Sequence, residues 1–337
     1  MIPSPKIPNL KFSTLMSRIS WGYVILFAVW ILLRLVFFDS LWWLAIINTV
    51  ALYIFVPLLL LLPPALLWRQ WRLLLGLGFP LGVFLAFYGS LFLPQLPSLA
   101  YKAVQPEITV MSFNMLFSNN DYDEIGRMIK ANTPDIVGIQ EVPLNGDAVW
   151  IKRFSSEYPY YAFRPVEEGH NVGIISRFPI ENVTILSNPP MRRALSATVN
   201  VNKGRVNKSL QVIVSHLTPN YPSNEFIKFA HEWYTRRANE VTYIRTLIQQ
   251  RRLPTIMLCD CNYVDTSQAY ARTHEVMKDS FREVGWGFGH TYRGPFFPIG
   301  RIDFVWYTKE LEAVEAWVPD GGGSDHLPVA VRLHFHA

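Results

Sequence analysis

The feature that most constrains this 337-residue chain is a nearly unbroken run of apolar residues from Trp21 to Leu93. A helix of about 20 apolar residues crosses a hydrocarbon core of about 30 Å. Three stretches of the run approach that length: Trp21–Phe38, Leu41–Leu62 and Leu73–Leu93. One such stretch could form a buried core helix, but three in succession predict an anchor of three transmembrane helices over residues 21–93.

Charged residues flank these stretches unevenly. Basic residues precede the first stretch and separate the second from the third, whereas a single acid separates the first from the second: Lys6, Lys11 and Arg18; Arg69 and Arg72; and Asp39. Because positively charged loops tend to stay in the cytoplasm, we expect residues 1–20 to form a cytoplasmic N-terminal segment of a plasma-membrane protein. Three crossings then place everything after Leu93 outside the cytoplasm.

The net charge of +5 and the sequence pI of about 9.1 would suit a nucleic-acid-binding protein. However, six of the 31 Lys and Arg residues and one of the 26 acids precede residue 101, which leaves 25 residues of each sign for the remainder. The surplus of positive charge therefore belongs to the anchor. This makes a nuclease less expected but leaves a local basic groove possible.

Residues 94–106 contain several prolines and predict a semi-rigid linker. From residue 107 to residue 337, short β-rich runs alternate with helical stretches, which predicts one α/β domain. We expect helices over Asp123–Ala131 and Glu225–Arg251. The expected strands are Ile108–Asn114, Asp135–Val142, Asn171–Ser176, Ala197–Val201, Gln211–His216, Thr255–Asn262, Ile302–Tyr307 and Val329–His334.

Several of these apolar strands run directly into hydrophilic residues. The residues concerned are Asn114, Glu141, His216, Asp260 with Asn262, Asp303, and Asp325 with His326. Such groups are costly to bury unless they are paired, hydrogen-bonded or bound to a metal. Each one alone would be read as a cap, a turn residue or a structural histidine, but their repetition at strand ends predicts one convergent site. Carboxylates and amides together favour Mg²⁺ or Mn²⁺.

The only two cysteines, Cys259 and Cys261, are separated by one residue. On a strand, both side chains would point the same way, and a bridge between them would be strained. We therefore expect buried thiols. A Cys-x-Cys pair of metal ligands is the alternative, although no further cysteine supports it.

Seven segments in order resemble the endonuclease/exonuclease/phosphatase superfamily, which includes deoxyribonuclease I, exonuclease III, neutral sphingomyelinases and inositol-polyphosphate phosphatases. They are SFN (Ser112–Asn114), DIVGIQEV (Asp135–Val142), GIISRFPI (Gly173–Ile180), SHLTP (Ser215–Pro219), CDCN (Cys259–Asn262), RIDFVW (Arg301–Trp306) and SDHLPV (Ser324–Val329). The resemblance spans about residues 107–335 and implies a four-layer α/β/β/α sandwich with the active site at one edge. CDCN departs from the usual Gly-Asp-Phe-Asn but keeps its acid and amide.

The resemblance also implies roles for the strand-end residues. Metal ligands would be Glu141, Asn114 and Asp325, and catalytic residues would be Asp260, Asn262, His216, His326 and Asp303. Asp260 would orient or deprotonate the attacking water, with Asn262 holding that water or a phosphate oxygen. His326, held by Asp303, would contact the scissile phosphate, and His216 would donate to a nonbridging oxygen. Attack by water in line with the leaving group requires no covalent intermediate.

Two arginines are weaker candidates for binding the substrate. Arg177 and Arg193 could grip a phosphate with paired hydrogen bonds. Surface charge is the commoner reason for an arginine at such positions.

The layout of three spans followed by this domain looks like the bacterial VanJ-type teicoplanin-resistance proteins. That resemblance implies hydrolysis of polyprenyl pyrophosphate carriers, and a tethered enzyme meets membrane lipids at high effective concentration. We therefore expect an Mg²⁺-dependent hydrolase of a lipid phosphate, with the bilayer as a partner and no protein partner indicated. The alternatives are an anchored nuclease acting on DNA and a non-catalytic membrane binding module.

Overall fold

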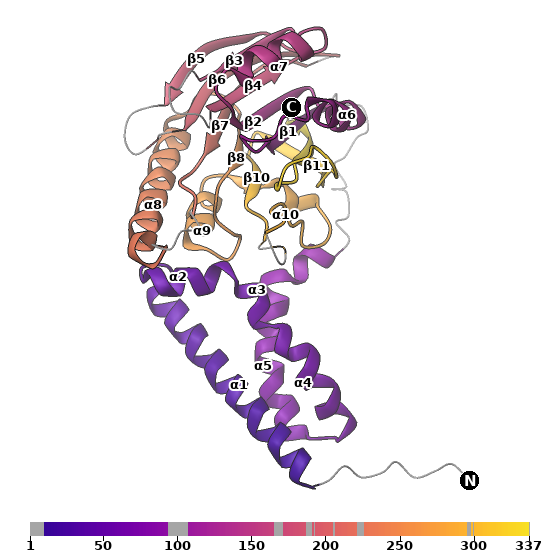
Figure 1. Cartoon of the computed structure of the whole chain (residues 1–337), viewed down its shortest axis with the longest axis vertical. Coiled ribbons are helices and arrows are strands. Elements are labelled where there is room, and N and C mark those ends of the chain that lie inside the picture. The colour runs from indigo at the N-terminus through magenta and orange to yellow at the C-terminus, as the bar shows by residue number, and fades with distance from the viewer. Residues whose placement is uncertain are drawn as a thin grey trace, which may run out of the picture. The chain divides into compact units, whose positions relative to one another are not determined.

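The computed structural model describes residues 10–93, 107–164, 171–186, 191, 193–204, 206–220, 226–294, 298 and 300–336. It divides into two compact units, Met1–Ser90 and Leu91–Ala337. The first unit contains only helices, and the second contains every described strand (Figure 1).

The first unit is built from apolar helices. They are α1 (Leu10–Phe37), α2 (Trp42–Thr49), α3 (Ala51–Ile54), α4 (Val56–Leu67) and α5 (Trp71–Tyr88), followed by the 3₁₀ helix η1 (Gly89–Phe92). Two segments, Thr14–Phe37 and Trp71–Phe92, are long and apolar enough to cross a membrane. Between them, Trp42–Thr49 and Ala51–Leu67 meet the same criterion only as a pair, and this pair is bent by 74°. The expected second span Leu41–Leu62 thus falls on this bent pair, which has the form of a broken span or a re-entrant loop.

The bend lies at Val50, and hydrogen bonds near the end of α2 hold that helix against the end of α1. Val50 leaves the helical conformation, with φ −103° and ψ 22°. The buried Asn48 side chain donates to the Asp39 carboxylate at 2.7 Å and to the Phe38 carbonyl at 3.2 Å. It also accepts from the indole nitrogen of Trp30 at 3.0 Å. These bonds tie α2 to the end of α1, and they satisfy polar groups that an apolar environment would otherwise penalise.

The second unit contains two six-stranded sheets. The first has the order β11-β12-β1-β2-β4-β3, and the second has the order β5-β6-β7-β8-β10-β9. The strands of the first sheet are β1 (Ile108–Asn114), β2 (Ile136–Val142), β3 (Tyr160–Phe163), β4 (Asn171–Ser176), β11 (Leu311–Trp317) and β12 (Val329–Phe335). Those of the second are β5 (Ile180–Leu186), β6 (Ala194–Lys203), β7 (Val206–His216), β8 (Thr255–Asp260), β9 (Lys278–Asp279) and β10 (Asp303–Tyr307).

Helices cover the outer face of each sheet. Helices α6 (Tyr122–Asn132) and α7 (Gly146–Phe154) share a buried cluster with β1 and β2. On the other side, α8 (Phe226–Gln250) and α9 (Gln268–His274) share one with β7, β8 and β10, while α10 (Ser280–Val284) precedes β10. The buried stripe of α8 is Val241, Ile244 and Ile248, at the spacing of one helix face. Each such side chain contributes about 1.5–3 kcal/mol on burial. The layers therefore run helix, sheet, sheet, helix.

The two sheets approach closely at Gly138 in β2. A Cβ atom placed there would lie 2.7 Å from Leu258 of β8 and 2.9 Å from Val214 of β7. No larger residue fits without a shift of the facing sheet. Nearby, the buried Gln140 side chain donates to the Leu258 carbonyl at 3.2 Å and so joins the sheets by a hydrogen bond.

The cysteines form a disulfide, Cys259–Cys261, so the expectation of two thiols was wrong. That expectation assumed an extended strand, in which Cα atoms two residues apart are separated by about 6.6 Å. Strand β8 ends at Asp260, and the Cα atoms of the two cysteines are only 5.1 Å apart. Both cysteines are buried in the core, and the bond leaves no thiolate to bind a metal.

Candidate active site

The predicted site residues gather at one end of the two sheets. Parallel strands β1 and β2 end there, with Asn114 the last residue of β1 and Glu141 the last but one of β2. Parallel strands β7 and β8 end there at His216 and Asp260. Antiparallel β10 begins at the same end, where Asp303 is opposite Asp260. Each sheet has one pair of parallel strands whose carboxyl ends lie side by side. Packing of the two sheets therefore brings these side chains together.

Glu141 has an unusual backbone for a strand residue. Its φ is +56°, and the pairing of β2 with β4 is irregular between Ile139 and Val142. A bulge of this kind re-aims a side chain, and positive φ in a non-glycine residue is costly. The side chain accepts a hydrogen bond from the Phe117 amide at 3.2 Å, and it remains 16% exposed. The Glu141 carboxylate is therefore fixed in orientation and partly accessible to solvent at the edge of the site.

Asn114 and Asp260 join the two sheets at the site. The amide nitrogen of Asn114 donates to the Asp260 carboxylate at 2.7 Å, and both side chains are buried. His216 Nε2 lies 3.5 Å from the same Asp260 oxygen and 3.9 Å from a Glu141 oxygen. These four residues come from four strands of two sheets.

His326 approaches the same oxygen of Asp260 as His216 does. Its Nδ1 contacts the Asp303 carboxylate at 2.8 Å, and its Nε2 lies 3.9 Å from Asp260. This arrangement fixes the orientation of the imidazole ring. The backbone nitrogen of His326 donates to the Ser324 hydroxyl at 3.0 Å, and that hydroxyl donates to the Asn114 carbonyl at 2.8 Å.

Asn262 and Asp325 complete the predicted set. Asn262 has φ +52°, its amide nitrogen donates to the Leu217 carbonyl at 3.1 Å, and its backbone nitrogen donates to Asp260 at 3.2 Å. Asp325 is half-buried, and its charge helps to raise the pKa of His326. The structure therefore brings all eight predicted metal and catalytic residues to one end of the sheets.

The electrostatics of the site reflect crowded carboxylates. Burial and the charge of Asp303 raise the pKa of Asp260 to about 7. Burial lowers the pKa of His326, but the nearby Asp303 and Asp260 carboxylates outweigh it and raise that pKa to about 10. The site thus concentrates negative charge that a cation would offset.

Groups of side chains able to hold a metal ion follow from this crowding. Glu141, His216 and Asp260 form one group, and Asp260, Asp303 and His326 form another. In each, one ligand atom per residue lies within 4.8 Å of the others. A third group on β11, β12 and the residue after β12 is remote from the site: Glu312, His334 and His336.

The two arginine candidates separate in the structure. Arg177 follows β4 and lies 3.8 Å from Asp135, which precedes β2. This is the opposite end of β2 from Glu141, so the prediction that Arg177 binds substrate is corrected: the arginine forms an ion pair at the far end of the sheet. Arg193 precedes β6, and its carbonyl accepts from the His216 amide at 2.9 Å. Arg193 therefore lies beside the site.

Tyr292 is a site neighbour that the sequence patterns did not indicate. Its ring centroid lies 4.9 Å from that of His326, and it forms isolated bridges with Gly300 and His326. No strand pattern or motif surrounds it in the sequence. Only the fold brings this loop against the segment that carries His326.

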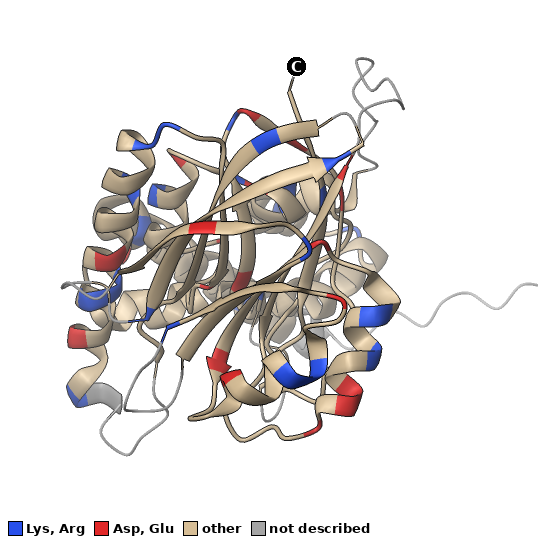
Figure 2. Cartoon of the chain, turned by 90° about the horizontal axis from the view of Figure 1, so that it is seen from above, with Lys and Arg blue, Asp and Glu red and all other residues tan. Residues whose placement is uncertain are grey.

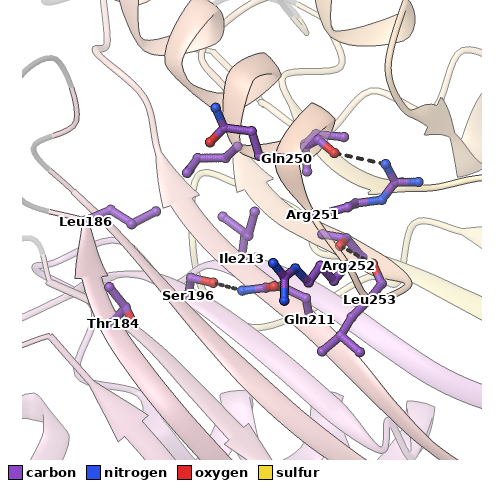
Figure 3. A pocket seen from close by; sticks show the side chains of 12 residues that line it. Thr184, Leu186, Ser196, Gln211, Ile213, Gln250, Arg251, Arg252 and Leu253 are labelled. Atoms are coloured by element: carbon purple, nitrogen blue, oxygen red, sulfur yellow. Dashed lines mark hydrogen bonds between the residues drawn. The ribbon is translucent and has the colours of Figure 1, made fainter.

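In the part of the chain that the structure describes, residues of the second sheet and of α8 line a smaller and a larger cavity. The smaller, of about 60 Å³, adjoins the site, since His216 and Arg193 line it. The larger, of about 430 Å³, is lined by residues that include Leu186, Gln211 and Arg252 (Figure 3). It also includes Thr255, the first residue of β8, and so lies towards the opposite end of that strand from Asp260.

Comparisons with known proteins agree with this fold. Residues 111–326 match the model of the Endonuclease/Exonuclease/phosphatase family. The endonuclease/exonuclease/phosphatase from Beutenbergia cavernae DSM 12333 is 21% identical, with a TM-score of 0.54 over 68% of this chain and 72% of that one. The corresponding protein from Bacteroides vulgatus is 18% identical, with a TM-score of 0.55 over 69% of this chain and 100% of that one.

A third similar structure is the 3′ phosphatase NExo from Neisseria bound to a product DNA hairpin. It is 17% identical, with a TM-score of 0.54 over 68% of this chain and 100% of that one. At these identities the likeness demonstrates a shared fold. No curated protein sequence matches the chain.

Proposed function

The chain belongs to the endonuclease/exonuclease/phosphatase family, and from that premise we propose a membrane-anchored phosphoesterase that hydrolyses a phosphate group of a membrane lipid. Members of the family are metal-dependent phosphoesterases, nucleases and phosphatases, so the chain is an enzyme that acts on phosphate ester bonds. One observation carries the proposal: Glu141, His216, Asp260 and His326 meet from distant segments at one end of both sheets.

The donor set fits a hard divalent cation. Carboxylate oxygens of Glu141 and Asp260 lie with His216 within reach of one ion, and the Asn114 amide is bonded to Asp260. We assign the metal, Mg²⁺ or Mn²⁺, to Glu141, Asn114 and Asp325, as the family resemblance implies. Of these, Glu141 belongs to the group that also contains His216 and Asp260. Bound there, it would supply Lewis-acid polarisation of the phosphoryl group and neutralise developing negative charge.

The remaining residues have positioning and proton-transfer roles. Asp260 orients the attacking water and accepts its proton, because its carboxylate is buried and held by Asn114. Asn262 positions that water or a phosphate oxygen. His326, oriented by Asp303, donates to the scissile phosphate, and His216 donates to a nonbridging oxygen. The water attacks in line with the leaving group, and no covalent intermediate is needed.

The anchor supports a lipid substrate. Two helices and one bent pair have the length and apolar composition of membrane spans. A catalytic domain of residues 107–337, tethered by the linker 94–106 to spans within 21–93, would meet lipid phosphates at high effective concentration. We infer a cytoplasmic N-terminus over residues 1–20, an extracytoplasmic catalytic domain, and a polyprenyl pyrophosphate or phospholipid as substrate. The VanJ-type resemblance favours the former.

A nuclease is the second candidate, since the similar NExo structure was solved with DNA. It is less favoured because the catalytic part of the chain has no surplus of basic residues. In Figure 2, basic and acidic positions are interspersed along the described elements. A non-catalytic binding module is third, and the retained acid, amide and imidazole groups argue against it.

The proposal is tested by one side-by-side assay of the purified chain in detergent, with Mg²⁺ or with EDTA. Substrates are undecaprenyl pyrophosphate, sphingomyelin, phosphatidylinositol and plasmid DNA. We expect metal-dependent release of phosphate or headgroup from a lipid and no nicking of DNA. Nicking without lipid hydrolysis would establish the nuclease, and no turnover of any substrate would favour a binding module.

A further inference from the structure

An exposed apolar surface surrounds the first residues of the second unit. Trp286 is 73% exposed, more than any other large apolar side chain that the structure describes in this unit. Its ring lies 5.9 Å from that of Phe92, which is 40% exposed, and the next residue, Leu93, is 63% exposed. Single exposed apolar side chains are ordinary on a protein surface, but neighbouring ones indicate a surface with a partner.

The loop after α10 fixes the position of Trp286 in this surface. On one side of Trp286 in the sequence is the end of α10, and on the other is Gly287, whose backbone nitrogen donates to the Leu91 carbonyl at 2.7 Å. The Phe288 ring packs edge-on against that of Phe92, with ring centroids 4.9 Å apart. Trp286 is therefore exposed because its loop is held beside Phe92, and the exposure belongs to a built arrangement of rings.

Continuity of the chain identifies the partner as a membrane surface. Phe92 is the last residue of Trp71–Phe92, one of the two segments long and apolar enough to cross a membrane. When such a segment spans a bilayer, its last residues lie in the interfacial layer, where Trp side chains are enriched because they combine an apolar body with a polar N–H. Trp286 packs on Phe92 and then lies in the same layer. Residues 284–292 contain no Asp, Glu, Lys or Arg, so contact with lipid buries no charge there.

The same loop continues into the candidate active site. Thr291 is buried, and its hydroxyl accepts from the backbone nitrogen of Asp303 at 3.1 Å. The next residue, Tyr292, packs against His326, with ring centroids 4.9 Å apart. Tyr292 is six residues after Trp286, and a chain of that length spans at most about 20 Å. The exposed rings therefore lie within a short distance of the proposed scissile phosphate.

We propose that Phe92, Leu93 and Trp286 form a membrane-docking surface, which holds the catalytic unit against the headgroup layer so that the substrate is taken directly from the bilayer. This inference rests on the proposed function and deepens it, because it assigns the surface by which the enzyme meets its lipid. The partner is the interface of the same bilayer that contains the anchor.

Spin labelling of the full chain in nanodiscs of phosphatidylcholine and phosphatidylglycerol tests the surface independently of catalysis. The native cysteines form a buried disulfide, so a nitroxide reacts only with an introduced cysteine. The variants are Trp286→Cys, Leu85→Cys in α5, and Val183→Cys on β5 as the matched control, since Val183 is apolar and 47% exposed. Oxygen concentrates in lipid, whereas a nickel chelate stays in water. We expect the ratio of oxygen to nickel relaxation at positions 286 and 85 to be severalfold higher than at 183.

Each outcome of the labelling has a definite meaning. A label at 286 that meets the nickel chelate as readily as the label at 183, while the label at 85 is in lipid, overturns the docking surface and leaves the anchor standing. A label at 85 that is itself in water overturns the anchor of the proposed function, and the docking surface with it.

An activity test measures whether this surface serves the active site. Undecaprenyl pyrophosphate in the same nanodiscs and water-soluble geranyl pyrophosphate are offered with Mg²⁺ to the wild type, Trp286→Ser, Trp286→Tyr and Val183→Ser. We expect Trp286→Ser to lower the ratio of kcat/KM for the embedded over the soluble substrate about tenfold, which corresponds to about 1.4 kcal/mol. Trp286→Tyr should keep most of that ratio, because tyrosine also favours the interfacial layer. Val183→Ser should match the wild type.

The two substrates separate a role at the membrane from a role in the site. Unchanged turnover of the embedded lipid by Trp286→Ser, or an equal loss on both substrates, overturns the inference. Absence of hydrolysis of either substrate by the wild type, with the label at 286 in lipid, overturns the lipid substrate and leaves the docking surface standing.

Discussion

At the scale of single residues, the site depends on side chains that the backbone holds in costly conformations. Glu141 and Asn262 both have positive φ, at 56° and 52°. Each conformation costs of order 1–3 kcal/mol and persists only where neighbours enforce it. At Asn262 those neighbours include Asp260 and Leu217, which accept its two hydrogen bonds. The strain therefore coincides with the proposed water and metal positions.

The first residue-scale prediction concerns these carboxylates. Glu141→Gln and Asp260→Asn should each lower kcat at least 100-fold, because charge stabilisation and proton transfer contribute about 10²–10³-fold. Glu312→Gln, in the remote group with His334 and His336, is the matched control and should retain wild-type kcat. Calorimetric titration with Mg²⁺ should show weaker binding to Glu141→Gln than to the wild type. Glu312→Gln should bind Mg²⁺ as the wild type does. Near-wild-type turnover by Asp260→Asn would show that Asp260 is not the residue that accepts the proton of the attacking water.

The second residue-scale prediction concerns Glu240. Burial raises the pKa of Glu240 in the folded protein above its ordinary value. A raised acid pKa means that the folded state binds the proton more tightly than the unfolded state. The contribution of Glu240 to stability is therefore largest below its unfolded pKa of about 4.3, and it declines as pH rises through the folded pKa.

Denaturant unfolding of the wild type and Glu240→Gln over a pH series measures this effect. The free energy of unfolding of the wild type should fall relative to that of the variant as pH rises through that window. A difference between the two proteins that does not change with pH would contradict the predicted linkage.

The sequence indicated the residues at strand ends but missed others for a physical reason. Asn114, Glu141, His216 and Asp260 each terminate or nearly terminate an apolar strand, and such a position is visible without coordinates. Tyr292 contacts His326 only because the fold brings a distant loop to the site. No local pattern encodes contacts of that kind.

At the scale of elements, close approach of the two sheets determines whether the site assembles. Gly138→Ala would place a Cβ atom within 2.9 Å of Leu258 and Val214. We expect a loss of about 1–3 kcal/mol, as for other overpacked cores. Gly126→Ala in α6 is the control, because its Cβ would meet Phe154 at an ordinary 3.6 Å. That variant should gain up to about 1 kcal/mol from helix propensity.

Thermal unfolding of the detergent-purified chain compares these two glycine variants. Gly138→Ala should melt below the wild type, and Gly126→Ala at or above it. Equal melting temperatures for both variants would show that the sheets can separate locally at no cost.

Buried strands were predictable from sequence, whereas several edge strands were not. The central strands β1, β4 and β8 are almost wholly buried and read as apolar runs. By contrast, β5 is exposed along most of its length, and the sequence of β11, LEAVEAW, consists largely of Leu, Ala and Glu, which favour helices. Strand β9 has only two residues. Pairing with neighbours, rather than local pattern, makes these segments strands.

At the scale of the whole molecule, the anchor prediction leads to a test of topology. A C-terminal alkaline phosphatase fusion should be active and a C-terminal green fluorescent protein fusion dark if the catalytic domain is outside. An outside location requires three crossings: Thr14–Phe37 and Trp71–Phe92 would provide two, and the bent pair between them would have to form the third. A bright fluorescent fusion with an inactive phosphatase fusion would place the domain in the cytoplasm and leave the bent pair as a re-entrant loop.

The disulfide between Cys259 and Cys261 has a consequence for where the chain matures. Cytosolic glutathione and thioredoxin keep such pairs reduced, whereas oxidising compartments allow them to close. The disulfide joins the two residues on either side of Asp260, the residue that we assign to the attacking water. The redox state of the compartment therefore determines whether a disulfide or two thiols flank that residue. A molecule whose catalytic domain stayed in the reducing cytosol would carry two thiols at these positions. Alkylation followed by mass measurement of the peptide that contains both cysteines would therefore distinguish a cytosolic from an extracytoplasmic catalytic domain.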